Sequence, residues 1–173
     1  MWRIRFLMRV LRPAVLRIWW RELDHVRLAS SGDLSLRVID LRSGPDRNPD
    51  LVVAQVSAAL GLISAAGQGF GELVVDHLQQ VIIAPGIHLI SVKPPVYWGS
   101  SAWLESEEAH YLASQLIWVA TSIRLHRNAR HAKRRADPEG VAQACWDAQE
   151  RFLRSFPDGN WWIQRIRPKG SAA

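Results

Sequence analysis

The chain has 173 residues, a length typical of one domain, and its 48% hydrophobic and 22% charged residues are ordinary for a folded globular protein. This composition excludes a disordered or low-complexity chain. The formal net charge is +6, which makes anionic partners plausible. We expect one domain over residues 1–173, mainly α within an α+β class, with four to five helices, a β-hairpin and one or two short strands.

The N-terminal segment, residues 1–28, is basic and amphipathic. Six arginines and no acidic residue occur in the first 21 residues. Pro13 suits a first helical position, and apolar residues recur after it at helical spacing. The arginines interrupt the continuous apolar run that a secretory signal needs. The pattern therefore predicts a retained helix that ends near Leu28.

Two elements follow in the predicted order. Loose alternation over residues 34–41 predicts a strand. Residues 48–50 then combine a capping Asn, a first-turn Pro and an Asp, as at the start of a helix. The next 21 residues, 51–71, are uncharged and long enough in principle to span a bilayer. Their Ala, Gly, Ser and Gln content favours a core helix that stops near Gly67, so we expect no transmembrane span.

A second helix is predicted from Phe70 to about Gln80. Two β-branched runs within residues 81–92 then flank a Pro-Gly pair, which suits the corners of a tight turn and predicts a hairpin. The prolines after Lys93 should close it, because proline cannot donate to an internal ladder. Residues 161–166 are expected to form a final strand.

Residues 102–135 are predicted to form one long helix of roughly 50 Å. Acidic residues gather near its start and basic residues at its end, as the helix dipole favours. A last helix is expected to begin at Asp137-Pro138. The long helix carries six cations and no acid between residues 124 and 135. It is therefore expected to have a basic C-terminal half.

This basic half is the main functional feature of the sequence. Wound at about 100° per residue, several of its cations share one face. Such a face can follow a phosphate backbone, because each Lys or Arg near a phosphate releases a counterion. The predicted binding residues are Arg124, Arg127, Arg130, His131, Lys133, Arg134 and Arg135. We predict a non-enzymatic, basic, arginine-rich protein that binds a nucleic-acid backbone together with other protein subunits.

Two other interpretations of these cations stay open. They can simply solvate the end of a helix, or they can dock on an anionic membrane or an acidic protein surface. Asp76 and His77, which are adjacent in a predicted helix, diverge by about 100° and do not suggest an acid–base pair. No phosphate-binding glycine loop and no nucleophile-elbow motif occurs in the chain.

A carboxylate and histidine spacing supplies an enzymatic alternative. Glu-x-x-His occurs at Glu22–His25 and at Glu107–His110, and this spacing presents both ligands from one helical face. Two such pairs, with one Glu from each of two other helices, form the ligand set of carboxylate-bridged di-iron bundles. Glu72 and Glu150 are the further candidates. The order along the chain differs from that class, so iron remains an alternative and the main hypothesis has no cofactor.

The cysteine and most of the tryptophans are expected to pack in the protein core. The one cysteine, Cys145, excludes an internal disulfide and is expected to be a buried, inert thiol in a reducing, cytoplasmic compartment. Nine tryptophans at largely helical spacing predict aromatic core contacts. The pairs 97–98 and 161–162 are expected to be the most exposed, because they lie in loops or near an edge.

Overall fold

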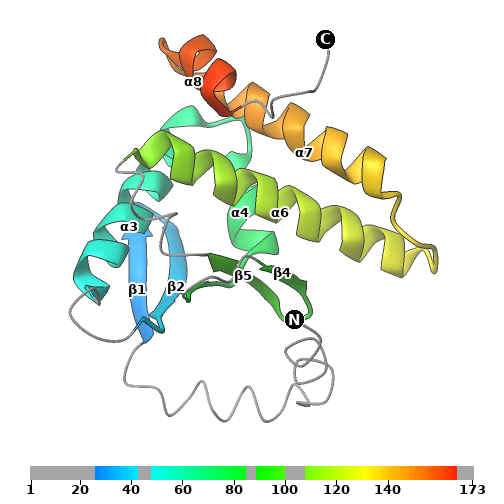
Figure 1. The fold of residues 1–173 in the computed structure, drawn as a ribbon, viewed down its shortest axis with the longest axis horizontal. Coiled ribbons are helices and arrows are strands. Elements are labelled where there is room, and N and C mark those ends of the chain that lie inside the picture. The colour runs from blue at the N-terminus through cyan, green and yellow to red at the C-terminus, as the bar shows by residue number, and fades with distance from the viewer. Residues whose placement is uncertain (1–25, 43–47, 85–88, 100–107, 167–173) are drawn as a thin grey trace.

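The structure, a computed structural model, describes residues 26–42, 48–84, 89–99 and 108–166. Within these ranges it contains five helices and one five-stranded mixed sheet. The prediction of an α+β fold with a β-hairpin is therefore confirmed. Helices gather on one side of the sheet (Figure 1), and two long helices, α6 and α7, run side by side across it.

Strands β1 (Val26–Ser31) and β2 (Leu34–Asp40) form an antiparallel hairpin at one edge of the sheet. The two residues between them suit a tight turn, and Gly32 there has a φ of +57°, which glycine adopts at little cost. The predicted first helix was expected to reach Leu28, and this end of it is wrong. Pairing with β2 overrides the helical spacing there, whereas residues 1–25 lie outside the described residues.

Helices α3 (Pro49–Ala66) and α4 (Phe70–His77) connect β2 to the next strand. The side chain of Asn48 accepts a hydrogen bond from the Leu51 N–H at 3.0 Å, and Pro49 opens the helix. Gly67 follows the last helical residue with a φ of +60°. Both predicted helix limits around α3 are thus confirmed, and α4 ends three residues before the predicted Gln80.

Helix α3 buries one side and leaves the other accessible. It is the one helix in the described part of the chain that is long and apolar enough to cross a membrane, judged by length and composition. Its buried side chains face the core and are Val52, Val56, Ala59, Leu60 and Ile63. The buried side of α3 therefore agrees with the expected core helix. A single helix of this length and composition is weak evidence for a membrane span.

The centre of the sheet is β3 (Gln80–Ile83), which is buried throughout and pairs in parallel with β2 and with β5 (Pro95–Gly99). Strand β4 (Leu89–Val92) pairs with β5 at the edge, so the order is β1-β2-β3-β5-β4. The predicted hairpin about the Pro-Gly pair is wrong. Strand β3 is paired on its two sides with β2 and β5, so β4 cannot pair with it, and the hairpin turn lies instead at Lys93-Pro94.

The C-terminal part is helical: α6 (Ala109–His131), α7 (Pro138–Leu153) and α8 (Gly159–Ile166). Helix α6 ends four residues before the predicted position 135, and residues 102–107 lie outside the described residues. The final strand predicted at 161–166 is also wrong. Asp158 accepts a bond from the Trp162 indole at 2.7 Å, a contact four residues apart that helical winding permits.

The main core lies between the sheet and helices α3, α4 and α6. Leu36, Val38, Val81 and Ile83 point into it from the strands, and α7 packs on α6. A smaller cluster of Ile39, Ile82 and Val96 lies on the other face of the sheet, as alternation along a strand requires. Helix α6 is therefore anchored to the sheet on one side and to α7 on another.

Candidate polyanion-binding surface

Helix α6 changes character at Arg124. Most residues from Leu112 to Ile123 are buried, whereas Ala129 is the only buried residue of the helix after Ile123. The seven predicted cations lie in the last two turns of α6 and in the segment that follows it. We call this set the basic surface: Arg124, Arg127, Arg130, His131, Lys133, Arg134 and Arg135.

The end of α6 is a specific hydrogen-bonded turn. The Lys133 N–H donates to the Arg130 carbonyl and the Arg134 N–H donates to the Ala129 carbonyl, both at 2.9 Å. This pair of bonds is a Schellman motif, and Lys133 occupies its left-handed position with a φ of +54°. Arg134 and Arg135 therefore lie beyond the helix. The prediction that one continuous helical face carries all these cations is wrong in this respect.

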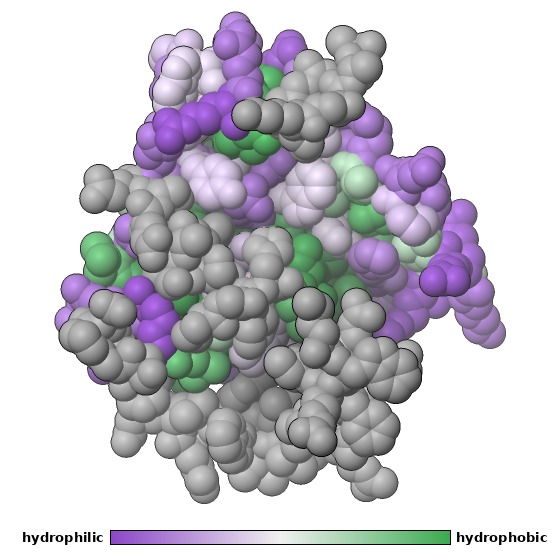
Figure 2. Space-filling view, in the orientation of Figure 1, coloured by the Kyte–Doolittle hydropathy of each residue, from purple (hydrophilic) through white to green (hydrophobic). Residues whose placement is uncertain are grey.

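A short connection then leads into α7. The Asp137 carboxylate accepts hydrogen bonds from the Glu139 N–H at 3.3 Å and the Gly140 N–H at 2.9 Å, which caps the helix. The α6–α7 turn extends beyond the sheet at the right of Figure 1, and Figure 2 shows hydrophilic side chains gathered at that end. The basic surface thus surrounds a projecting turn between two packed helices.

The charges of the basic surface are not matched by carboxylates from the described residues. Arg127 donates through Nη1 to the carbonyl of Asp76 at 3.3 Å, and so contacts the C-terminal end of α4. All residues from Arg130 to Arg135 are exposed. The ion pairs formed between described residues are Asp40 with Arg42, Glu150 with Arg154 and Glu108 with Arg165.

A shallow groove lies beside the basic surface, between the end of α6 and the start of α7. Its volume is about 280 Å³, its floor includes Leu125, Ala129 and Val141, and Arg134 and Arg135 also line it. Sequence reasoning did not predict this groove, because it arises from the packing of α6 against α7. It places apolar surface directly next to two exposed guanidinium groups.

The di-iron alternative gains no support from the described residues. Glu22, His25 and Glu107 lie outside them. The imidazole of His110 stacks on Trp162 at a centroid distance of 5.2 Å, and Glu150 pairs with Arg154. Glu72 is exposed on α4, and no group of three or more His, Cys, Asp or Glu in the described ranges is placed to hold a metal ion.

The predicted burial of the cysteine and exposure of the aromatic pairs are confirmed in part. Cys145 is fully buried, and burial raises the pKa of its thiol to about 12, so the expectation of a buried thiol is confirmed. Trp161 is 51% exposed, as expected. Trp162 and Tyr97 are buried instead, because α8 turns Trp162 inward and the sheet points Tyr97 at the main core.

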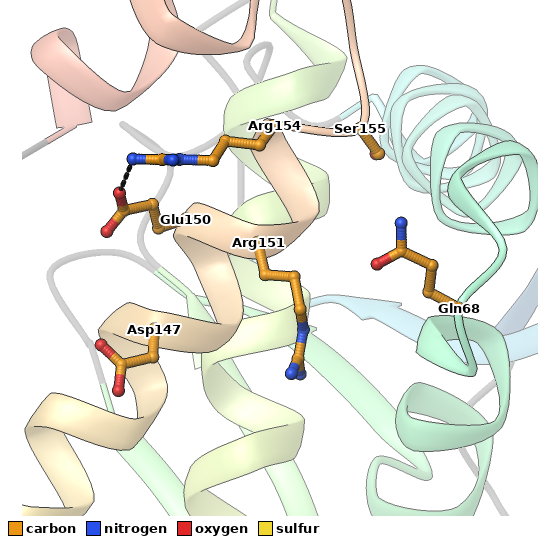
Figure 3. Close-up of a pocket in the computed structure, with 6 residues that line it drawn as sticks. All are labelled: Gln68, Asp147, Glu150, Arg151, Arg154 and Ser155. Carbon is orange, nitrogen blue, oxygen red and sulfur yellow. Dashed lines mark hydrogen bonds and ion pairs between the residues drawn. The ribbon is translucent and has the colours of Figure 1, made fainter.

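A second hollow, of about 410 Å³, lies between α7 and the α3–α4 turn. Figure 3 shows its polar lining, in which Arg154 reaches Glu150, while Arg151 extends from α7 and Gln68 from the α3–α4 turn. The Arg151 guanidinium lies 5.6 Å from the centre of the Phe70 ring. Because Asp147 and Glu150 balance the two arginines, this hollow suits a polyanion less well than the basic surface does.

No protein-family model, no curated protein and no solved structure matches this chain. One residue near the basic surface was not identified from the sequence, namely His77 at the end of α4. Only the packing of α4 against α6 brings it to the arginines, and no local spacing could indicate this.

Proposed function

We propose that this protein binds the phosphate backbone of a nucleic acid through the basic surface, as a non-enzymatic member of a larger assembly. The observation that carries the proposal is the concentration of seven cationic or titratable side chains at one projecting helix end, without ion pairing to the described carboxylates. Cations in this state gain more from an external phosphate than cations already paired within the fold.

The scaffold beneath these cations favours the same function. Helix α6 is held by its buried first half and by α7, so the basic surface is attached to a rigid support. A support of this kind reduces the entropy lost when charged side chains bind a partner. Arginine is suited to the contact, because its planar guanidinium forms paired hydrogen bonds with phosphate and stays charged at physiological pH.

Asp137 and Asp76 lie near the basic surface but form no ion pair with its cations. Both carboxylate oxygens of Asp137 accept backbone N–H groups of α7. Asp76 meets Arg127 through its carbonyl oxygen. A phosphate chain approaching the turn therefore meets mainly positive charge, and the binding should depend strongly on salt and little on base sequence.

A charge-matched comparison tests the proposal. In the first variant Arg130, Arg134 and Arg135 are replaced by Ala, and in the control variant Arg27, Arg37 and Arg151 are replaced by Ala. All six are exposed, so both variants lose the same charge from accessible positions. Affinity for a 20-base-pair DNA duplex is measured by fluorescence anisotropy over a range of salt concentrations.

We expect the first variant to reduce the slope of log affinity against log salt by up to about three units, and the control to leave it nearly unchanged. Equal loss in the two variants would show that only net charge matters and would overturn the proposal. Tighter binding to vesicles that contain phosphatidylserine, or to an acidic peptide, than to the duplex would replace nucleic acid with that partner.

A further inference from the structure

A hollow of about 620 Å³ lies at the end of the sheet where β3 and β5 begin. Four residues that pair in turn across the sheet line it, namely Leu28, Arg37, Gln80 and Val96. Paired residues on adjacent strands point to the same face of a sheet, and successive residues along a strand alternate between faces. Because Val81 belongs to the main core, this row of side chains lies on the opposite face.

Gln80 is the most buried polar residue of this row. Only 6% of it is exposed, yet its side-chain amide forms no hydrogen bond with another described residue. Most buried polar side-chain groups in proteins have a hydrogen-bond partner, so an unpaired amide here indicates a position for a ligand. Since Gln80 lines the hollow, a bound molecule meets its NH2 donor and its carbonyl acceptor.

Arg37 lies directly beside Gln80. The two residues are register partners on β2 and β3, and adjacent strands are about 5 Å apart, so both side chains can contact one small group. Arg37 is exposed and forms no ion pair with a described carboxylate. Ser35, two residues earlier on β2, adds a hydroxyl group to the same lining. The hollow thus combines one positive charge with an unpaired amide.

The remaining wall of the hollow is mostly apolar. Leu28 from β1 and Val75 from α4 are 61% and 40% exposed, so apolar side chains contact water there. Leu78, Pro94 and Val96 complete the apolar lining. Small-molecule sites commonly have apolar walls, a few fixed polar groups and a volume of this size. A ligand that covers these side chains gains free energy by removing their surface from water.

We propose that this hollow binds a small organic molecule that has one carboxylate and an apolar body. The carboxylate accepts paired hydrogen bonds from the Arg37 guanidinium, and the NH2 group of Gln80 donates a further bond to it. One guanidinium balances the single charge of a carboxylate, whereas a phosphate monoester carries about −1.5 to −2 at pH 7. This site is additional to the proposed function, because none of the basic-surface cations is among the described residues that line the hollow.

The main test measures the binding of octanoate to the full chain by isothermal titration calorimetry. Arg37→Gln removes the proposed carboxylate partner and should weaken binding at least about tenfold, as expected for a hydrogen bond to a charged group. Arg27→Gln is the matched control and should leave the affinity nearly unchanged. It removes the same charge from the same hairpin, but Arg27 pairs with Val38 of the main core and so lies on the opposite face.

Two results of this titration would overturn the proposal. The first is an equal loss of affinity in the two arginine variants, which would show that only net charge matters. The second is the absence of octanoate binding to the parent protein at millimolar concentration.

Gln80→Leu tests the amide separately. This variant should bind octanoate roughly threefold to tenfold more weakly, because one hydrogen bond to the carboxylate is lost. The midpoint of thermal unfolding without ligand should not fall, since the parent amide has no hydrogen bond to another described residue. Octanoate binding at the parent affinity would refute the role of Gln80. A lower unfolding midpoint would do the same, because it would show that the amide is bonded within the fold.

Three further probes define the class of ligand. Octanamide has the same chain without the charge and should bind at least about tenfold more weakly. Hexanoate lacks two methylene groups of octanoate and, at about fourfold for each buried methylene, should bind roughly tenfold more weakly. Inorganic phosphate should not compete with octanoate. Equal binding of octanamide, no dependence on chain length, or competition by phosphate would each exclude an apolar carboxylate as the ligand.

Discussion

The two halves of α6 differ more than any two neighbouring regions of the fold. From Leu112 to Ile123 the helix packs on the sheet and on α7, and ten of its twelve residues there are buried. From Arg124 to His131 six of its eight residues are charged or polar, and Ala129 alone is buried. One continuous backbone therefore joins a segment that stabilises the fold to a segment that is free to contact a partner.

This division means that stability and binding can be altered separately. Buried apolar side chains contribute to stability through the surface that they remove from water, whereas exposed cations contribute little to it. Substitutions in one half of α6 should therefore change one property and leave the other unaltered.

Replacing Ile117 by Ala should have the largest effect. Ile117 is fully buried in the first half of α6, so the variant should lose about 2–5 kcal/mol of unfolding free energy, measured by urea denaturation. Arg130→Ala is the matched change in the second half and should alter stability by no more than about 0.5 kcal/mol. If the two changes cost the same, the proposed division of α6 would be wrong.

Replacing Asp137 by Ala should cost about 1 kcal/mol, because α7 loses the carboxylate that accepts its first N–H groups. Asp137→Asn retains a capping oxygen but removes the negative charge, so it should stay close to the parent stability. Both variants should bind the DNA duplex slightly more tightly, since each removes a negative charge near the basic surface. Equal destabilisation by Ala and Asn would show that charge, and not capping, matters.

Replacing Lys133 by Gly should give the smallest change, and with the opposite sign. Lys133 adopts a left-handed conformation, which glycine tolerates better, so thermal unfolding should show a gain of up to about 1 kcal/mol. Lys133→Ala removes the same charge but keeps a side chain that disfavours the left-handed backbone conformation. The two variants should reduce the salt dependence of DNA binding equally, by about one unit of slope. A stabilised Ala variant would contradict the backbone explanation.

Features that depend on neighbouring residues could be predicted from the sequence. The caps at Asn48 and Asp137 depend on side chains next to the helix start, and the structure confirms both. The end of α6 was predicted too late, because no glycine marks the left-handed position that Lys133 occupies. The strand at Val26–Ser31 was missed because its apolar spacing also fits a helix, and pairing with β2 decides between them.

Features that depend on distant residues could not be predicted in this way. The strand order places β5 beside β3, although β4 follows β3 in the chain, and no local pattern distinguishes these arrangements. The basic surface was evident as a cluster of charge in the sequence. His77 was not part of that cluster, because its relation to Arg124 and Arg127 exists only through the packing of α4 on α6.

The sheet consists of two antiparallel hairpins, β1–β2 and β4–β5, that are joined only through β3. Each hairpin can form between residues that are close in sequence. Pairing of β3 with β2 instead requires closure of the whole segment that contains α3 and α4, and this carries a larger loss of chain entropy. The four residues of β3 therefore determine whether the two halves of the sheet become one cooperative unit.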